Sequence, residues 1–118
     1  MKTEPLAPIP DVKGCPVTYC LSVIGGKWKP VILYCISNGV DRFGAMQRVV
    51  FGITKQMLTK QLREMEADGL ITRTVFPVVP PRVDYALTDK GRSLLPVISQ
   101  MKQWGEAHQG EAHQEGAS

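Results

Sequence analysis

Residues 53–92 read ITKQMLTKQLREMEADGLITRTVFPVVPPRVDYALTDKGR, and this stretch decides the fold. Its first third has the periodicity of an amphipathic helix. Two β-rich segments follow, on either side of a proline-rich turn, and the last residues open another helix. The stretch therefore predicts a helix, a two-stranded hairpin and the start of a second helix, in that order.

The predicted helix of this stretch has clear ends and two different faces. Thr54 is a good N-cap, and Asp68-Gly69 supplies the stop, because glycine adopts the left-handed conformation at low cost. One face carries the apolar residues Leu58, Leu62 and Met65. The opposite face carries Lys55, Gln56, Thr59, Lys60 and Arg63. Such side chains contact base edges and phosphates, although the same pattern also suits an ordinary solvated helix face.

The predicted hairpin favours the first of these two interpretations. Its strands cover residues 69–76 and 82–88, and the turn at 77–81 holds three prolines, which fix φ and remove donors. Arg82 leaves this stiff turn where a wing would contact phosphate. The alternative is a plain surface hairpin. A helix followed by such a wing predicts a mainly α fold with a small β-hairpin, the winged helix-turn-helix of DNA-binding proteins.

The first half of the chain is predicted to supply the supporting helices. We expect helices over residues 16–24 and 27–37 and a third within 42–50, with Trp28, Val31, Ile32, Cys35 and Ile36 on the core face of the second. The helix that follows Thr54, which we call the recognition helix, is joined to the third helix through Phe51-Gly52. Together they form the helix-turn-helix unit. Lys27, Arg42 and Arg48 are candidates for contacts with the DNA backbone.

The last predicted helix runs from Asp89 to near Ala107, with a bend at Pro96. Its apolar stripe consists of Leu94, Leu95, Val97, Ile98, Met101 and Trp104. The stripe either packs on its own domain or forms a homodimer interface, shared with the helix of residues 16–24. We favour the dimer, because two-fold symmetry lets two recognition helices read the half-sites of a palindromic operator in double-stranded DNA.

Short motifs spread over residues 15–107 identify a family. In order they are Cys15-Pro16-Val17, Ile24-Gly25-Gly26-Lys27-Trp28, Arg42-Phe43, Gly52-Ile53-Thr54, residues 62–71, residues 80–85 and Leu87-Thr88-Asp89-Lys90-Gly91. As a set they resemble the HxlR (DUF24) family of MarR-like winged helix-turn-helix transcription regulators. The resemblance implies a dimeric repressor or activator that responds to electrophiles, oxidants or another chemical cue. Gly44 departs from the serine usual in the family.

The three cysteines form no CxxC pair and no zinc-binding pattern. Cys20 and Cys35 fall on apolar helix faces and are expected to be small buried residues. Cys15 precedes a predicted helix N-terminus, where partial positive charge favours the thiolate. The resemblance implies that this residue is the redox sensor, reacting with an oxidant or a quinone-like electrophile. The alternative is a cysteine that serves packing.

Length and composition point to one cytoplasmic domain. The chain has 118 residues and 43% hydrophobic residues, without an apolar segment long enough for a membrane span or a signal peptide. We expect a flexible arm over residues 1–14, the folded domain over 15–107 and a disordered tail over 108–118. The net charge is +3, and since residues 103–118 hold three Glu and no Lys or Arg, the remainder carries +6. A basic body with a polar tail suits a nucleic-acid binder.

Other functions find little support in the sequence. The tail holds His108 and His113 among glutamates, but two histidines without fixed neighbours make a poor metal site, so we expect no metal. No phosphate-binding glycine loop, nucleophile elbow or paired catalytic carboxylates are present, so neither an enzyme nor a cofactor is expected. The remaining alternative is a winged-helix module that binds proteins without specific DNA binding.

Overall fold

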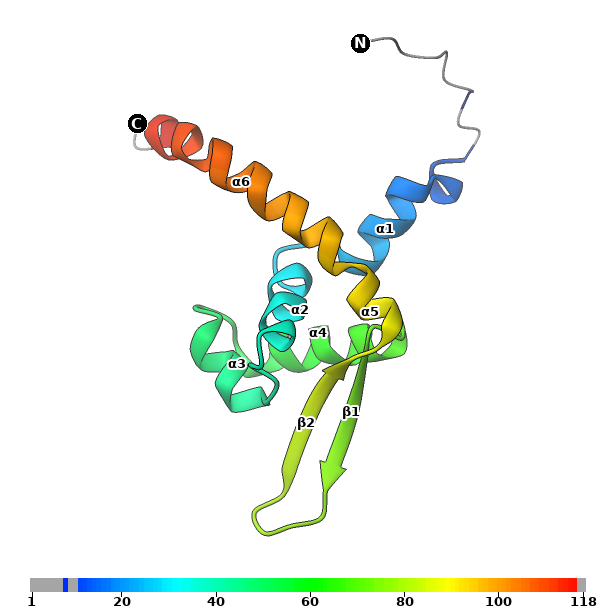
Figure 1. Ribbon diagram of the computed structural model, residues 1–118, viewed down its shortest axis with the longest axis vertical. Coiled ribbons are helices and arrows are strands. Elements are labelled where there is room, and N and C mark those ends of the chain that lie inside the picture. The colour runs from blue at the N-terminus through cyan, green and yellow to red at the C-terminus, as the bar shows by residue number, and fades with distance from the viewer. Residues whose placement is uncertain (1–7, 9–10, 117–118) are drawn as a thin grey trace.

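The computed structural model describes residues 8 and 11–116 and has the predicted mainly α architecture with one hairpin (Figure 1). In chain order the elements are η1 (Val12–Gly14), α1 (Pro16–Ile24), α2 (Lys29–Ser37), α3 (Phe43–Val49), α4 (Lys55–Ala67), β1 (Ile71–Phe76), β2 (Arg82–Leu87), α5 (Asp89–Ser93) and α6 (Leu95–Gly116). The two strands pair antiparallel, from Ile71 opposite Leu87 to Phe76 opposite Arg82. The winged helix-turn-helix prediction is confirmed.

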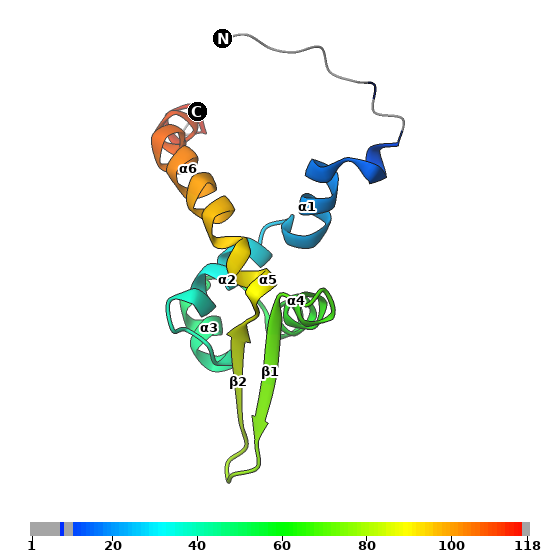
Figure 2. The same cartoon turned by 45° about the vertical axis from the view of Figure 1, so that its right-hand side comes forward.

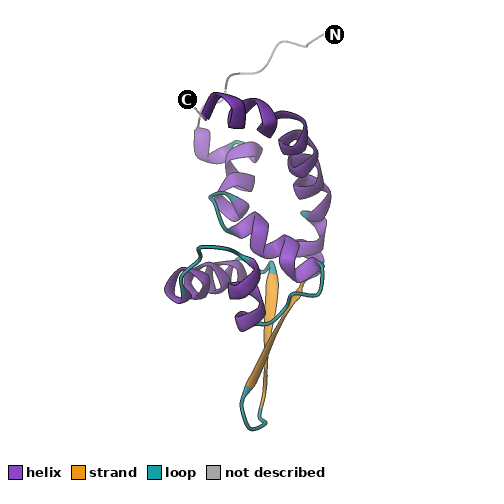
Figure 3. Cartoon of the chain, turned by 90° about the vertical axis from the view of Figure 1, so that its left-hand side faces the viewer, coloured by secondary structure: helices purple, strands orange, loops and turns teal. Residues whose placement is uncertain are grey.

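The elements divide the molecule into two halves. Helices α2, α3 and α4 and the base of the hairpin form the lower half, from which the hairpin projects as a wing (Figure 1). Helices α1 and α6 extend on the opposite side and diverge from each other (Figure 2). The view in Figure 3 also separates the helices at the top from the strands at the bottom. The molecule is therefore elongated, with extents of 60 × 39 × 22 Å.

The core lies in the lower half. The largest fully buried side chains are Ile24, Ile32, Leu33, Met46, Leu58, Met65, Leu70 and Ile71. The predicted core face of α4 is confirmed. That of α2 is wrong at two positions, because Val31 is 43% exposed and Leu33, which was not predicted, is fully buried. Helix α2 is apolar on several sides, so its pattern did not fix the rotation of its core face. Val31 instead lines a shallow groove with Met101 of α6.

The ends of α4 follow the local signals in the sequence. The Thr54 hydroxyl accepts a hydrogen bond from the Met57 amide at 3.1 Å, which satisfies one of the free amides of the first turn. Gly69, with φ of +76°, ends the helix in the left-handed conformation that other residues adopt at a cost. The recognition helix therefore begins and ends as the sequence predicts.

A tight joint ties the end of α4 to the start of α5. The Thr88 amide donates to the Leu70 carbonyl at 3.0 Å, and the Lys90 ammonium donates to the Asp68 carbonyl at 2.9 Å. A Cβ atom at Gly91 would lie 2.1 Å from the Leu70 carbonyl oxygen, so only glycine fits there. Thr88 also caps α5 by accepting from the Gly91 amide at 3.0 Å.

The last predicted helix differs from the structure in two ways. It is broken at Leu94 into α5 and α6, so Pro96 lies in the first turn of α6, where its missing amide costs no hydrogen bond. Its predicted end near Ala107 is wrong, because α6 continues to Gly116 through most of the predicted tail of residues 108–118. The Trp104 and His108 rings stack at 4.5 Å, and the Trp104 carbonyl lies 2.9 Å from His108 Nδ1, which supports the added turns.

The predicted arm of residues 1–14 lies largely outside the described residues. Its end is structured, since Val12–Gly14 form η1 directly before α1. None of the helices described here is long and apolar enough to span a membrane.

Candidate nucleic-acid interface

The five polar residues predicted for DNA contact lie together on α4. The structure gathers Lys55, Gln56, Thr59, Lys60 and Arg63, which we call the recognition surface, along one shallow groove. Their side chains are exposed, except for the half-buried Thr59, and lie opposite the buried Leu58, Leu62 and Met65 stripe. Within the part of the chain that the structure describes, the three cations of this surface form no ion pair. Their charge is therefore available to a ligand.

An ion pair fixes α4 to α2 at the border of this surface. The Lys29 ammonium lies 2.8 Å from a Glu64 carboxylate oxygen. The hydrogen bond from Lys29 lowers the pKa of Glu64, because it stabilises the carboxylate. Lys29 is thus occupied within the protein, whereas the recognition surface is not.

The wing brings two of the predicted arginines to one carboxylate. Arg82 donates to both oxygens of Asp84, at 3.1 and 2.8 Å, and its guanidinium lies 4.8 Å from the centre of the Phe76 ring. Arg42, which precedes α3, approaches the same carboxylate at 3.4 Å. The hydrogen bond from Arg82 is the main cause of the lowered pKa of Asp84. Arg42 and Arg82 therefore form a wing cluster with Asp84 that holds two cations in place.

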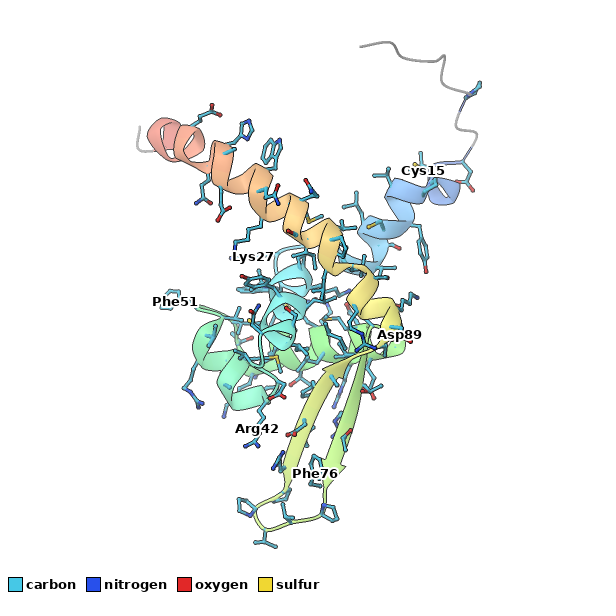
Figure 4. The ribbon with its side chains drawn as sticks, viewed as in Figure 1. Cys15, Lys27, Arg42, Phe51, Phe76 and Asp89 are labelled. Carbon is cyan, nitrogen blue, oxygen red and sulfur yellow. The ribbon has the colours of Figure 1, made fainter. Side chains whose placement is uncertain are left out.

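Lys27 does not lie with these residues. Figure 4 places it at the start of α2, nearer to α6 than to the wing at Phe76. Its ammonium lies 4.7 Å from the centre of the Trp28 ring. Arg48, the other backbone candidate, is exposed on α3. The predicted basic residues are thus divided between the recognition surface, the wing cluster and two separate positions.

Two residues at this interface were missed in the sequence. Asp84 was counted only as part of a strand, although its spacing of two from Arg82 puts both side chains on one face of β2. Arg73, in the middle of β1, is exposed and borders a cleft beside α4. The alternation along β1 held this signal, but only the position of α4 shows which side of the strand matters.

Cys15 lies far from the recognition surface, at the N-terminus of α1 (Figure 4). The thiol itself caps no amide, yet the nearby amides of Thr18 and Val17 lower the pKa of Cys15, because they stabilise the thiolate. Cys35 is buried as predicted, and burial raises the pKa of its thiol. Cys20 is only half-buried, against the edge of the core. Cys15 is thus the cysteine with the environment of a reactive thiol.

The predicted apolar stripe of the last helix divides between two environments. Ile98 is buried and Leu94 and Leu95 pack against the core, so part of the stripe serves its own domain. The remaining residues of the stripe, Val97, Met101 and Trp104, are exposed, as are Val17, Tyr19 and Leu21 of α1. We call these six side chains together the upper apolar surface. Trp104 is 68% exposed. Large apolar side chains left open in this number indicate an interaction surface.

No group of three or more His, Cys, Asp or Glu side chains able to hold a metal ion occurs among residues 8, 11–12 and 14–111. The ring of His108 stacks on the ring of Trp104. His113 lies outside the residues with described side chains.

Comparisons with known proteins agree with the geometry. The family described as HxlR-like helix-turn-helix matches residues 23–113. The HTH-type transcriptional regulator YybR of Bacillus subtilis is 50% identical over 99 residues, 84% of this chain and 79% of that protein. The oxidised form of the redox regulator HypR is 51% identical, with a TM-score of 0.76 over 80% of this chain and 97% of that one. The reduced form of the transcriptional regulator YodB from B. subtilis is 30% identical, with a TM-score of 0.68 over 80% and 93%.

Proposed function

Because the chain belongs to the HxlR-like helix-turn-helix family of transcription regulators, we propose that it acts by binding specific double-stranded DNA. The observation that carries the proposal is the recognition surface. There, three cations that form no ion pair among the described residues stand beside Gln56 and Thr59 on the exposed face of a capped helix. Arg and Lys pair with guanine, and Gln with adenine, in the major groove. Helix α4 is the element that enters this groove.

The upper apolar surface supports a homodimer as the active form. Burying Met101 and Trp104 against a second copy stabilises the complex through the hydrophobic effect. A two-fold axis that passes beside α1 and α6 and runs along the long direction of the molecule puts two wings and two α4 helices on one side of the dimer, since both lie on the side away from α1 and α6 (Figure 1). Such a dimer reads a palindromic operator with half-sites about 34–36 Å apart.

Cys15 is proposed as the chemical input. Two solved structures that this chain resembles are named as the oxidised and reduced forms of the redox regulator HypR. The lowered pKa of Cys15 raises the share of thiolate, the form that a quinone-like electrophile alkylates or a peroxide oxidises to sulfenic acid. Cys15 directly precedes α1, so its alkylation or oxidation acts on the upper apolar surface. Through that surface it acts on the distance between the two recognition helices of the dimer.

We propose no catalysis, cofactor or metal for the chain, and we place it in the bacterial cytoplasm with the DNA. The competing function is a winged-helix module that binds other proteins without specific DNA binding. A mobility-shift assay with the DNA upstream of the protein's own gene, at two salt concentrations, separates the two. A regulator binds this DNA specifically, and its binding weakens steeply as the salt concentration rises. Equal binding to unrelated duplexes contradicts specific recognition.

Variants assign the roles within the proposal. Gln56→Ala is expected to cost about 1–3 kcal/mol of binding and relax specificity at one base pair, whereas Arg82→Ala weakens binding to all sequences. Cys15→Ser is expected to stay on DNA in the presence of quinone or peroxide. The matched controls Cys20→Ser and Cys35→Ser keep the response. If the inducer releases the Cys15→Ser variant from DNA as it releases the wild type, the sensor is not Cys15.

A further inference from the structure

A cleft of about 300 Å³ separates the recognition helix from the wing. Phe43 of α3, Leu62 of α4 and Tyr85 of β2 line its apolar part. Four polar side chains complete the lining, Thr59, Arg63 and Glu66 from α4 and Arg73 from β1. The cleft thus connects the recognition surface, through Thr59 and Arg63, to β1, through Arg73.

The strand register fixes the side on which Arg73 projects. Arg73 is the partner of Tyr85 across the hairpin, and residues directly opposite each other project from the same face of a sheet. Tyr85 is only 9% exposed and belongs to the core beneath α4. Arg73 therefore projects toward α4, whereas its neighbours Thr72 and Thr74 project to the other face.

The charges of the cleft differ from those of the wing cluster. In the wing cluster, Asp84 already pairs with Arg42 and Arg82. In the described part of the chain, neither Arg63 nor Arg73 forms an ion pair, and Glu66 lines the cleft without lying within 4 Å of either guanidinium nitrogen. Two guanidinium groups against one carboxylate leave a net positive cleft. Such a site favours an anion that can receive two planar guanidinium forks.

We propose that this cleft binds a backbone phosphate of the DNA duplex, held between Arg63 and Arg73, with the Thr59 hydroxyl as a further donor. The inference rests on the proposed function, because it assumes that α4 enters the major groove. The DNA strand at the edge of that groove then passes between α4 and the wing, where the cleft opens. Phosphate contacts of this kind set the position of a protein on the duplex and carry no sequence information.

The test measures binding of a random-sequence duplex as a function of salt, since phosphate contacts do not depend on sequence. Arg73→Ala is expected to weaken binding about tenfold at low salt, as the loss of a charge-assisted hydrogen bond implies. The slope of log K against log salt should fall by about 0.9, the value for one phosphate. Lys102→Ala removes the same charge from α6, away from the wing, and Thr72→Ala changes the opposite face of β1. Both controls should keep the wild-type slope.

A second readout follows the arginine directly. The Nε–H resonance of Arg73 should shift on addition of the duplex, whereas that of Arg92, which donates to the Leu87 carbonyl at 2.9 Å, should not. If the wild type binds duplex DNA but Arg73→Ala matches Lys102→Ala in affinity and slope, the phosphate site is wrong and the proposed function stands. If the folded wild type binds no duplex at any salt concentration, both proposals fall.

Discussion

The recognition helix and the two upper helices treat their apolar residues in opposite ways. In α4, Leu58 and Met65 are fully buried, and no large apolar side chain of the helix is exposed. In the upper half, Tyr19 is 58% and Trp104 68% exposed on helices that diverge from each other. The comparison shows that the recognition helix buries its apolar face within its own domain, whereas the upper helices leave a surface that a second copy can cover.

The largest effect is expected from removing a side chain of the completed core. Leu62→Ala should reduce the free energy of unfolding by about 2–5 kcal/mol, because Leu62 is 2% exposed and the substitution leaves a cavity. Urea denaturation followed by circular dichroism measures the loss. A loss below about 1 kcal/mol would mean that the lower half is loosely packed and would break the comparison.

Substitutions in the upper half should weaken dimer formation and leave the folding of each protomer unchanged. Replacing both Met101 and Trp104 by Gln should weaken a dimer by roughly 1–3 kcal/mol, since both side chains are partly exposed in the protomer. Light scattering over a range of concentrations measures the shift toward monomer, and far-ultraviolet circular dichroism should be unchanged. A wild-type chain that is monomeric throughout would remove the basis for this half of the comparison.

A smaller loss of stability is expected at the N-terminus of the recognition helix. Thr54→Ala removes the acceptor of the Met57 amide and should cost about 1 kcal/mol of stability. Thr54→Ser keeps the hydroxyl and serves as the matched control. Thermal melting of the three proteins gives the order. An alanine variant as stable as the serine variant would show that packing, and not the cap, fixes the start of α4.

The smallest effect on folding should come from the exposed wing cluster. The folded pKa of Asp84 lies below its unfolded value, mainly through the hydrogen bond from Arg82, so its contribution is present above the unfolded pKa. That contribution is lost as pH falls through the folded pKa, in the acid range. Asp84→Asn should abolish this part of the pH dependence in denaturation curves, and should strengthen DNA binding, since Arg42 and Arg82 lose a competitor for phosphate. Weaker binding would show that Asp84 positions the arginines.

The sequence predicted best what short segments determine. The limits of α4 follow from Thr54 and Gly69, which act on their own neighbours, and the wing follows from two strands around a proline-rich turn. The extension of α6 was missed because a polar composition was taken for disorder, although Glu, Ala and Gln favour helix. The recognition surface could be listed from one helix alone.

Contacts between distant segments could not be predicted. Arg42 and Asp84 are neighbours only because α3 begins beside β2, and no local pattern gives that distance. The side of β1 on which Arg73 projects matters only once α4 is packed against it. The same holds for Val31 and Leu33, whose burial depends on where α6 crosses α2.

The joint at Gly91 limits how the two halves can move relative to each other. With no room for a Cβ atom beside the Leu70 carbonyl, and with Thr88 bonded to the same carbonyl, α5 cannot slide along the end of α4. We therefore expect α4 and α5 to turn as one rigid lever whose pivot is the break at Leu94. A few degrees of rotation about that pivot displace the far end of the wing more than residues close to the pivot. A movement of α6 therefore causes its largest displacement at the tip of the hairpin.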